Sequence, residues 1–391
     1  MVDYAKRMNG QDGSLIKGLF RLIDKPNIIS FAGGFPSPDA FPVDIINEIT
    51  AKVFKDGGSR LLQYGTTEGL IPLREWIVSH VKERGLNATI DNVLVLSGSQ
   101  QGIDLISKAL LDPGDVVLIE RPTYLTAINI FKSYQADIKD VEMDDMGLIP
   151  EKLEEAILAY KPKFLYTIPT FQNPSGVTSS SERREKLMEI IQKYQIIMVE
   201  DDPYGDLRYD GDVVPYMSHY DTCGLSVLLG SFSKTISPGL RTGFAVGNEE
   251  IISKMALCKQ INDVHTSNLS QKIVADFCNN GYFDIHLKNI IPAYKLKRDT
   301  MHNAFEKYFP TEAKWVKPEG GLFIWCELPE RINTQQLLEE AAKNDVAFIP
   351  GVPFFADGSG KNALRLNFSN SSIEGIDVGM QRLGKVVKEA L

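Results

Sequence analysis

The sequence is poor in cysteine and contains no long apolar run. Its four cysteines form no C-x-x-C pair and have no histidine at metal-ligand spacing; they are Cys223, Cys258, Cys278 and Cys326. This pattern indicates neither a zinc site nor a disulfide framework, so we expect no bound metal and a reducing, cytoplasmic setting. The N-terminus lacks the apolar stretch of a signal peptide, and no segment has the length needed to span a bilayer, so we expect neither export nor a membrane anchor.

Basic residues are also in the minority. The chain has 42 Lys and Arg against 51 Asp and Glu, which gives a formal net charge of −9. Nonspecific affinity for nucleic acid depends on clustered Lys and Arg that release counterions, and no long basic run is present, so we expect no nucleic-acid partner. The 391 residues, 43% of them hydrophobic, predict a globular chain with one large and one smaller unit.

The middle of the chain alternates short apolar runs with longer segments of helical periodicity, which is typical of a parallel sheet covered by helices. Six runs have the length and composition of strands: residues 92–96, 116–119, 164–168, 196–199, 226–229 and 243–246. Residues 100–111 and 182–194 repeat apolar side chains at intervals of three and four and predict helices. From residue 285 onward, a Lys-rich helical pattern (285–308) and short apolar runs at 320–326 and 364–368 predict a smaller α+β unit.

Three segments carry polar residues to the ends of predicted strands. The segment Ser97 to Gly102 opens a predicted helix with small residues, which favours an anion site at the helix N-terminus, although a plain turn would have the same pattern. Asn173 follows another strand, at the sheet edge where α/β proteins bind ligands, and Asn-Pro is also a common turn. Glu200, Asp201 and Asp202 end a third strand; they would need a metal or a protonated heterocycle as cationic partner, or form a solvated loop.

The most specific segment runs from Ser231 to Gly243 between two apolar strands. It contains Ser233 and Lys234, with Arg241 seven positions after the lysine. A lysine sheltered from water and close to another cation is suited to Schiff-base chemistry, and the short hydroxyls and the arginine would supply donors to a phosphate.

Taken together, these motifs resemble the class I and II aminotransferases, which are pyridoxal phosphate (PLP) enzymes of fold type I. The matching segments cover nearly the whole chain: 31–36, 63–65, 97–100, 121–124, 173–174, 201–204, Lys234 and Arg365. The resemblance implies an α/β fold, with a large domain built on a mostly parallel seven-stranded sheet and a smaller α+β domain. It also implies an N-terminal arm or lid at residues 1–45, which contributes to the small domain, a large cofactor-binding domain at 46–285, and a small domain at 286–391.

The resemblance also assigns roles to individual residues. Lys234 would bind PLP covalently and then carry protons, and Asp201 would keep the pyridine nitrogen protonated. Asn173 and Tyr204 would hydrogen-bond the phenolic oxygen, with Tyr204 counted among the catalytic residues, and Tyr124 would stack on the ring. The residues expected at the phosphate are Ser99, Gln100, Ser231, Ser233, Arg241 and, from the neighbouring subunit of a homodimer, Tyr64.

For the substrate, the resemblance places the α-carboxylate on Arg365, with Asn173 nearby and with Gly33 and Gly34 allowing the N-terminal segment to close. The alternation of residues 364–368 turns Arg365 away from Leu364 and Leu366, toward the cleft.

The N-terminal segment looks like that of the 2-aminoadipate, kynurenine and aromatic or branched-chain aminotransferases, in which a mobile helix acts as a lid. Lys17 or Arg21 would then read a distal carboxylate, as in glutamate or 2-oxoglutarate, although both could be solvated lid charges. The segment from His265 to Gln271 lacks the arginine of aspartate-specialised members, which argues against aspartate as the preferred donor.

Three alternatives remain open from the sequence. A PLP-dependent lyase would use the same cofactor for a different reaction. A ligand sensor would use the fold behind a DNA-binding domain, for which the roughly 30 residues before Phe31 are too few. An inactive scaffold is disfavoured because Lys234, Asp201, Asn173, Tyr204, Arg241 and Arg365 are all present.

Overall fold

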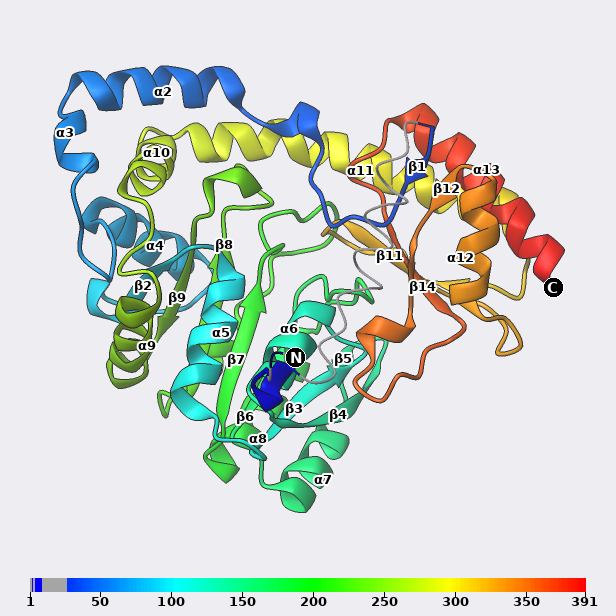
Figure 1. The fold of residues 1–391 in the computed structure, drawn as a ribbon, viewed down its shortest axis with the longest axis horizontal. Coiled ribbons are helices and arrows are strands. Elements are labelled where there is room, and N and C mark those ends of the chain that lie inside the picture. The colour runs from blue at the N-terminus through cyan, green and yellow to red at the C-terminus, as the bar shows by residue number, and fades with distance from the viewer. Residues whose placement is uncertain (1, 3, 9–26) are drawn as a thin grey trace.

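The computed structural model describes residues 2, 4–8 and 27–391, and it is built around an eight-stranded sheet (Figure 1). The strands in spatial order are β2 (Val93–Leu96), β9 (Gly243–Gly247), β8 (Ser226–Ser231), β7 (Ile197–Asp202), β6 (Phe164–Thr167), β3 (Val116–Arg121), β4 (Asp137–Asp144) and β5 (Gly147–Leu148). The strands from β8 to β4 are parallel, whereas β2 pairs antiparallel with β9, β9 with β8, and β4 with β5. The fold is therefore α/β with a mostly parallel central sheet, as expected, but the sheet has eight strands instead of seven because the two-residue β5 adds to its edge.

The six apolar runs correspond to β2, β3, β6, β7, β8 and β9. Successive side chains of a strand point to opposite faces, and both faces of this sheet are buried. Leu94 and Leu96 pack with one set of helices, and Val93 and Val95 pack with another. The helices around the sheet are α2 (Val43–Lys55), α3 (Gly58–Leu61), α4 (Ile71–Glu83), α5 (Ser99–Leu110), α6 (Leu125–Ser133), α7 (Pro150–Tyr160), α8 (Ser181–Tyr194), α9 (Glu249–Asn262) and α10 (Asn268–Asn279). We call this sheet with these helices the large unit.

A second, smaller unit contains two more sheets. The first is antiparallel, in the order β10 (Lys314–Trp315), β11 (Phe323–Glu327), β14 (Ala363–Asn367) and β13 (Ile349–Pro350). The second pairs β1 (Ile29–Ser30) with β12 (Val346–Ala347) in parallel, so residues near the N-terminus join the C-terminal part of the fold. The helices α12 (Thr334–Lys343) and α13 (Ile373–Ala390) cover these sheets. We call this assembly the small unit.

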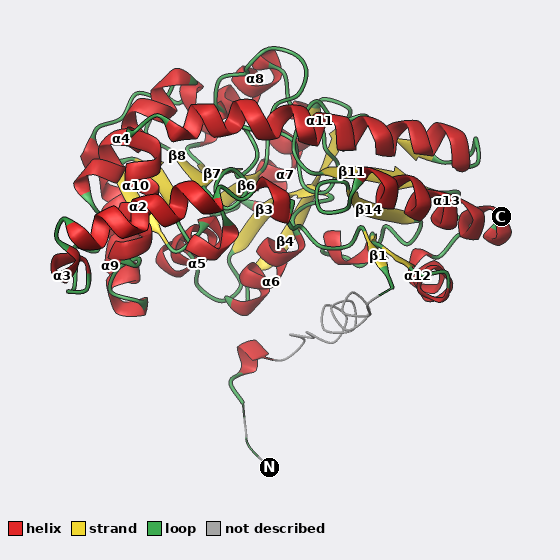
Figure 2. Cartoon of the chain, turned by 90° about the horizontal axis from the view of Figure 1, so that it is seen from above, coloured by secondary structure: helices red, strands yellow, loops and turns green. Residues whose placement is uncertain are grey.

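A 27-residue helix, α11 (Tyr282–Tyr308), extends from the large unit to the small one (Figure 2). Its first turn places Phe283 in a core of the large unit, and its later turns place Tyr294 and Phe305 in the core of the small unit. That second core also takes in Phe171 and Tyr204 from loops of the large unit. The two units therefore share a buried apolar interface.

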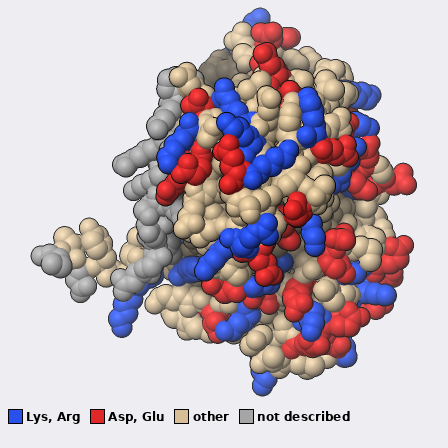
Figure 3. Space-filling model, turned by 90° about the vertical axis from the view of Figure 1, so that its right-hand side faces the viewer, with Lys and Arg blue, Asp and Glu red and all other residues tan. Residues whose placement is uncertain are grey.

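Short 3-10 turns connect several of these elements: η1 (Lys6–Met8), η2 (Pro38–Ala40), η3 (Ile90–Asn92), η4 (Met217–Tyr220), η5 (Pro238–Leu240) and η6 (Val352–Phe354). Acidic and basic side chains are interspersed on the face at the small-unit end of the molecule (Figure 3). Within the described part of the chain, no helix has both the length and the apolar character needed to cross a membrane.

Candidate active site

A cavity of about 390 Å³ lies where the carboxyl ends of β6 and β7 face the small unit. Carboxyl ends of parallel strands are the usual ligand-binding edge of an α/β sheet. The sequence-predicted residues that line this cavity are Gly34, Ser99, Gln100, Tyr124, Asn173, Asp201, Tyr204, Ser231, Ser233, Lys234, Arg241 and Arg365. Segments far apart in the chain thus meet at one site.

Lys234 lies in the turn between β8 and β9, and its Nζ donates a 2.8 Å hydrogen bond to the carbonyl oxygen of Gly34. Burial, together with the nearby positive charges of Arg365 and Arg241, lowers the pKa of Lys234 to about 8. A larger share of this amine is therefore neutral near pH 7 than of an exposed lysine, and the neutral amine is the form that acts as a nucleophile or a base.

The N-terminus of α5 forms one end of the cavity. Gly98 precedes the helix with φ of +94°, and a Cβ there would lie 2.6 Å from Nη2 of Arg241. A Cβ on Gly243 would lie 2.9 Å from the backbone nitrogen of Ser99, so glycine at both positions leaves room beside the helix amides. These amides, together with the cavity-lining Ser231, Ser233 and Arg241, suit a phosphate group.

Asp201 is the second-last residue of β7 and is buried in the cavity wall. Burial, assisted by the negative charges of Asp202 and Glu120 and opposed by a hydrogen bond from Tyr166, raises the pKa of Asp201 to about 7. The hydroxyl of Tyr166 donates to Oδ2 at 2.7 Å, whereas Oδ1 is buried and has no hydrogen-bond partner in the described structure. A cationic donor such as a protonated pyridine nitrogen would satisfy this oxygen, so the residues present fit PLP.

Arg365, in β14, reaches the same cavity from the small unit. Its Nη1 donates to Oδ1 of Asn173 at 2.8 Å and its Nη2 donates to the carbonyl oxygen of Ala32 at 3.0 Å. The guanidinium carbon lies 4.0 Å from the ring centroid of Phe323, and burial lowers the pKa of Arg365 to about 10. Its Nε is buried and has no partner within the described residues, so the guanidinium has an unused donor.

Tyr124 and Tyr204 complete the cavity wall. Tyr124 precedes α6, and Tyr204 follows β7 and packs edge-on against Phe323 with ring centroids 5.8 Å apart. Burial raises the pKa of Tyr204, and the positive charge of Arg365 opposes this shift. The hydroxyl of Tyr204 therefore stays protonated near neutral pH and can donate a hydrogen bond to an anionic oxygen.

One described residue among those predicted does not join this group, and two others fall outside the described residues. Tyr64 does not line the cavity of the single chain; its side chain is 80% exposed, and its ring meets His265 edge-on at a centroid distance of 5.9 Å. Lys17 lies outside the described residues, as does Arg21.

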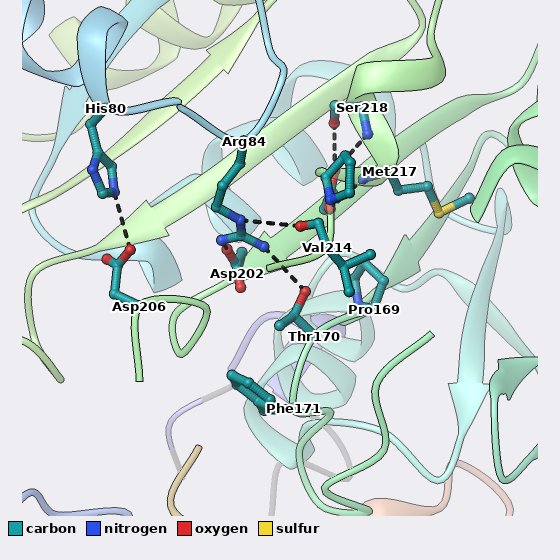
Figure 4. A network of polar contacts seen from close by, with 12 residues as sticks. His80, Arg84, Pro169, Thr170, Phe171, Asp202, Asp206, Val214, Met217 and Ser218 are labelled. Carbon is teal, nitrogen blue, oxygen red and sulfur yellow. Dashed lines mark hydrogen bonds and ion pairs between the residues drawn. The ribbon is translucent and has the colours of Figure 1, made fainter. Parts of the chain in front are cut away.

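The three consecutive carboxylates at the end of β7 do not share one partner. Glu200 accepts hydrogen bonds from the backbone nitrogens of Met217 and Ser218 at 2.9 and 2.8 Å. Asp202 forms an ion pair with Arg84. Asp206 faces His80 in Figure 4, and its Oδ1 lies 3.3 Å from Nε2 of the histidine. Because side chains alternate along a strand, only Asp201 of the three lines the cavity.

Sequence reasoning missed two buried partners of the site, Tyr166 and Glu120. Tyr166 holds Asp201, as described above. Glu120 is 2% exposed and accepts a 2.9 Å hydrogen bond from Nε2 of Gln172, the neighbour of Asn173. A carboxylate directly after the apolar run of residues 116–119 was the available signal, because a charge that ends a buried strand needs partners.

Comparison with known proteins supports this geometry. The family described as aminotransferase class I and II matches residues 28–383. Aromatic-amino-acid aminotransferase 1 of Thermococcus litoralis is 41% identical, over 99% of this chain and 94% of the relative. The structure of Pyrococcus horikoshii kynurenine aminotransferase has a TM-score of 0.96 and 40% identity, covering 99% of this chain and 97% of that one. LysN, the α-aminoadipate aminotransferase of Thermus thermophilus complexed with N-(5'-phosphopyridoxyl)-L-leucine, has a TM-score of 0.92 and 35% identity, covering 99% and 97%.

Proposed function

The chain belongs to the class I and II aminotransferase family and is a PLP-dependent aminotransferase, and from this premise we propose its substrates and the roles of its residues. The proposed donor is an aromatic, branched-chain or 2-aminoadipate-like L-amino acid, and the proposed acceptor is a 2-oxo acid such as 2-oxoglutarate. The observation that carries the proposal is the meeting of Lys234, Asp201 and Arg365 in one cavity. Bound PLP supplies an electron-withdrawing ring and a carbonyl group that can take up an amino group.

Lys234 is proposed to hold the cofactor and, once released, to carry a proton on Nζ to and from the substrate α-carbon. Its lowered pKa suits this role, because an amine that titrates near neutral pH can both accept and return a proton. Asp201 would hold a proton on the ring nitrogen through the oxygen that has no partner in the described structure. Tyr204 and Asn173 would donate hydrogen bonds to the phenolic oxygen.

Arg365 is proposed to bind the α-carboxylate that every donor and acceptor shares. A guanidinium matches a carboxylate in shape and charge, and the bonds to Asn173 and Ala32 fix its orientation. The carbonyl oxygen of Gly34, which accepts a hydrogen bond from Nζ of Lys234, is a further polar group beside the amine.

The preference for apolar and aromatic donors is supported by the cavity wall beyond Arg365. Leu125, Ile349, Pro353 and Phe35 line it and offer apolar contacts to a side chain. For a longer acidic side chain, Lys17 or Arg21 of the N-terminal segment is the proposed cationic partner.

We further propose that the enzyme is a homodimer in which Tyr64 completes the phosphate site of the partner subunit. Tyr64 lies close in sequence to another exposed apolar side chain, Leu62, as expected of a surface that a second copy covers. Mixing Tyr64→Ala and Lys234→Ala subunits tests this. Each mixed dimer would regain one intact site, so about a quarter of the wild-type activity should return after random exchange. No recovery in dimers shown to have exchanged would contradict the shared site.

The domain limits and the location are also proposals. We infer an N-terminal arm or lid at residues 1–45, a large domain at 46–285 and a small domain at 286–391. The passage of α11 from one core to the other supports a boundary in its first turns. The four free thiols support a cytoplasmic location.

An absorbance experiment tests the substrate proposal. Purified protein loaded with PLP is scanned while amino acids are added singly, and 2-oxoglutarate or pyruvate is then added. The expected result is loss of the visible band with aromatic, branched-chain or 2-aminoadipate donors and its return with the 2-oxo acid. If ammonia and an oxo acid are released without any acceptor, the enzyme acts as a lyase on that donor. If only aspartate responds, the proposed donors are wrong.

A further inference from the structure

Glu120 is a buried carboxylate next to the cavity, and the proposed mechanism does not use it. It lies near the end of β3 and is 2% exposed. Its Oε1 accepts hydrogen bonds from Oγ1 of Thr167 at 2.5 Å and from the backbone nitrogen of Ile168 at 2.9 Å. Its Oε2 accepts from Nε2 of Gln172 at 2.9 Å. All three donors belong to the segment 167–172, which leads directly to Asn173.

This carboxylate has no ion-pair partner among the residues that the structure describes. Burial raises the pKa of Glu120 to about 7, and the bonds from Thr167, Gln172 and Ile168 oppose the shift. Burying an acid without a cation costs free energy, so packing alone would favour an apolar side chain at this position. A buried acid with a raised pKa that lies next to a binding site therefore indicates a functional role for that acid.

The side-chain amide of Gln172 transmits the contact to the loop that contains Asn173. Its Nε2 also donates to the carbonyl oxygen of Pro122 at 2.7 Å, and its Oε1 accepts from the backbone nitrogen of Ser175 at 2.8 Å. The amide therefore ties Ser175, two residues after Asn173, to Glu120 and Pro122, and Oδ1 of Asn173 in turn accepts from Arg365.

We propose that Glu120 is a positioning residue that, through Gln172, sets the place of Asn173 and thereby aims Arg365 at the carboxylate of the substrate. This inference rests on the substrate-binding role proposed for Arg365 and Asn173. A carboxylate is required because it only accepts hydrogen bonds, whereas all of its neighbours here are donors. Glutamine at position 120 would keep the volume but could present an NH₂ group to Nε2 of Gln172, so that two donors would face each other.

The first experiment compares wild type with Glu120→Gln. We expect KM to rise about 10-fold for both the amino acid and the 2-oxo acid, because both carry the carboxylate that Arg365 binds, with a smaller change in kcat. An equilibrium measurement accompanies the kinetics: 3-phenylpropanoate, which has the carboxylate but no amino group, should bind about 10-fold more weakly when followed by the visible absorbance of the holoenzyme. The dissociation constant of PLP should change less than 3-fold.

A double-mutant cycle separates positioning from mere stabilisation. Gln172→Asn shortens the amide by one methylene and should raise KM and the 3-phenylpropanoate dissociation constant as Glu120→Gln does. If Glu120 acts through Gln172, adding Glu120→Gln to Gln172→Asn should change either constant by less than about 2-fold. Gln172→Asn also serves alone if Glu120→Gln does not fold. Glu142→Gln, an exposed residue of the neighbouring strand β4, is the control and should behave as wild type.

Unchanged KM and unchanged 3-phenylpropanoate binding in folded Glu120→Gln would overturn the inference, as would additive effects in the cycle. The wild-type assay comes first and keeps the two questions apart. If the wild type transfers no amino group, the proposed substrates fail, whereas a competent wild type with an unaffected variant disproves only the role of Glu120.

Discussion

Arg365 donates a 2.8 Å hydrogen bond to Asn173, although the two residues are 192 positions apart in the chain. Arg365 belongs to β14 of the small unit, and Asn173 follows β6 of the large unit. The bond crosses the interface between the units at the cavity, so substrate binding by Arg365 depends on how the units are held together. Residues this far apart in the chain, and in different units, come into contact only in the folded protein.

Replacing Arg365 with lysine should weaken every substrate to a similar degree. Lysine keeps the positive charge but loses the planar pair of donors, and a charge-assisted hydrogen bond contributes about 1.5–3 kcal/mol. We therefore expect KM for donor and acceptor to rise about 10- to 100-fold, measured by steady-state kinetics. Arg382→Lys in α13 is the matched control, because Arg382 is partly exposed and is not among the residues that line the cavity. A rise confined to one substrate would mean that Arg365 reads a side chain instead.

Replacing Lys234 with alanine should abolish turnover while PLP still binds without a covalent bond. The amine is the proposed covalent anchor and proton carrier, and its loss should lower kcat about 1,000-fold or more. Borohydride reduction followed by mass measurement of the protein distinguishes the two modes of binding. Lys254→Ala, an exposed lysine of α9, controls for the loss of a positive charge. Cofactor that remains covalently attached to the Lys234 variant would contradict the assignment.

The sequence predicted those parts of the fold whose signal is local. The strands β2, β3, β6, β7, β8 and β9 contain continuous apolar runs because both of their faces are buried, even in β2 at the edge of the sheet. The strand β4 was not among the six predicted runs, since Asp137, Lys139, Asp140, Glu142 and Asp144 give it the composition of a loop. It lies toward the sheet margin next to the two-residue β5, and its Asp137, Glu142 and Asp144 are exposed.

The cavity was predicted because each of its segments carries its own motif, and every predicted site residue that the structure describes, except Tyr64, lines it. The support behind these residues could not be predicted in the same way. Glu120 meets Thr167 because β3 and β6 are parallel neighbours with Ile119 opposite Tyr166, and that register is a tertiary property. Buried polar pairs of this kind depend on which strands become neighbours, which one strand's composition does not specify.

Replacing Asp201 with asparagine should leave PLP bound but slow the reaction. An amide cannot supply the negative charge that keeps the ring nitrogen protonated, so kcat should fall about 100-fold or more. Tyr166→Phe should have a much smaller effect, because it removes one hydrogen bond to Asp201 and leaves the charge in place. Single-turnover kinetics with a fixed donor measure both. Equal losses in the two variants would mean that the geometry of the pair matters more than the charge of Asp201.

The stability of the cofactor-free protein should fall as the pH rises from about 5 to 8. The pKa values of Asp201 and Glu120 are both raised to about 7 by burial, whereas in the unfolded chain they lie near 4. Between these values the folded protein retains protons that the unfolded chain has released, so each step up in pH favours unfolding until both groups are ionised. The total loss is of the order of a few kcal/mol, measurable by urea denaturation at several pH values.

Two comparisons identify which groups cause the dependence of the unfolding free energy on pH. Asp201→Asn and Glu120→Gln each remove one titrating group, so each should flatten the dependence of unfolding free energy on pH between 5 and 8, whereas Glu142→Gln should leave it unchanged. Adding PLP should flatten it too, because Asp201 paired with a cationic ring stays ionised and its pKa returns toward the ordinary value. A slope as steep in both variants as in the wild type would place the titration on other groups. A slope that PLP does not alter would show that Asp201 gains no cationic partner when the cofactor binds.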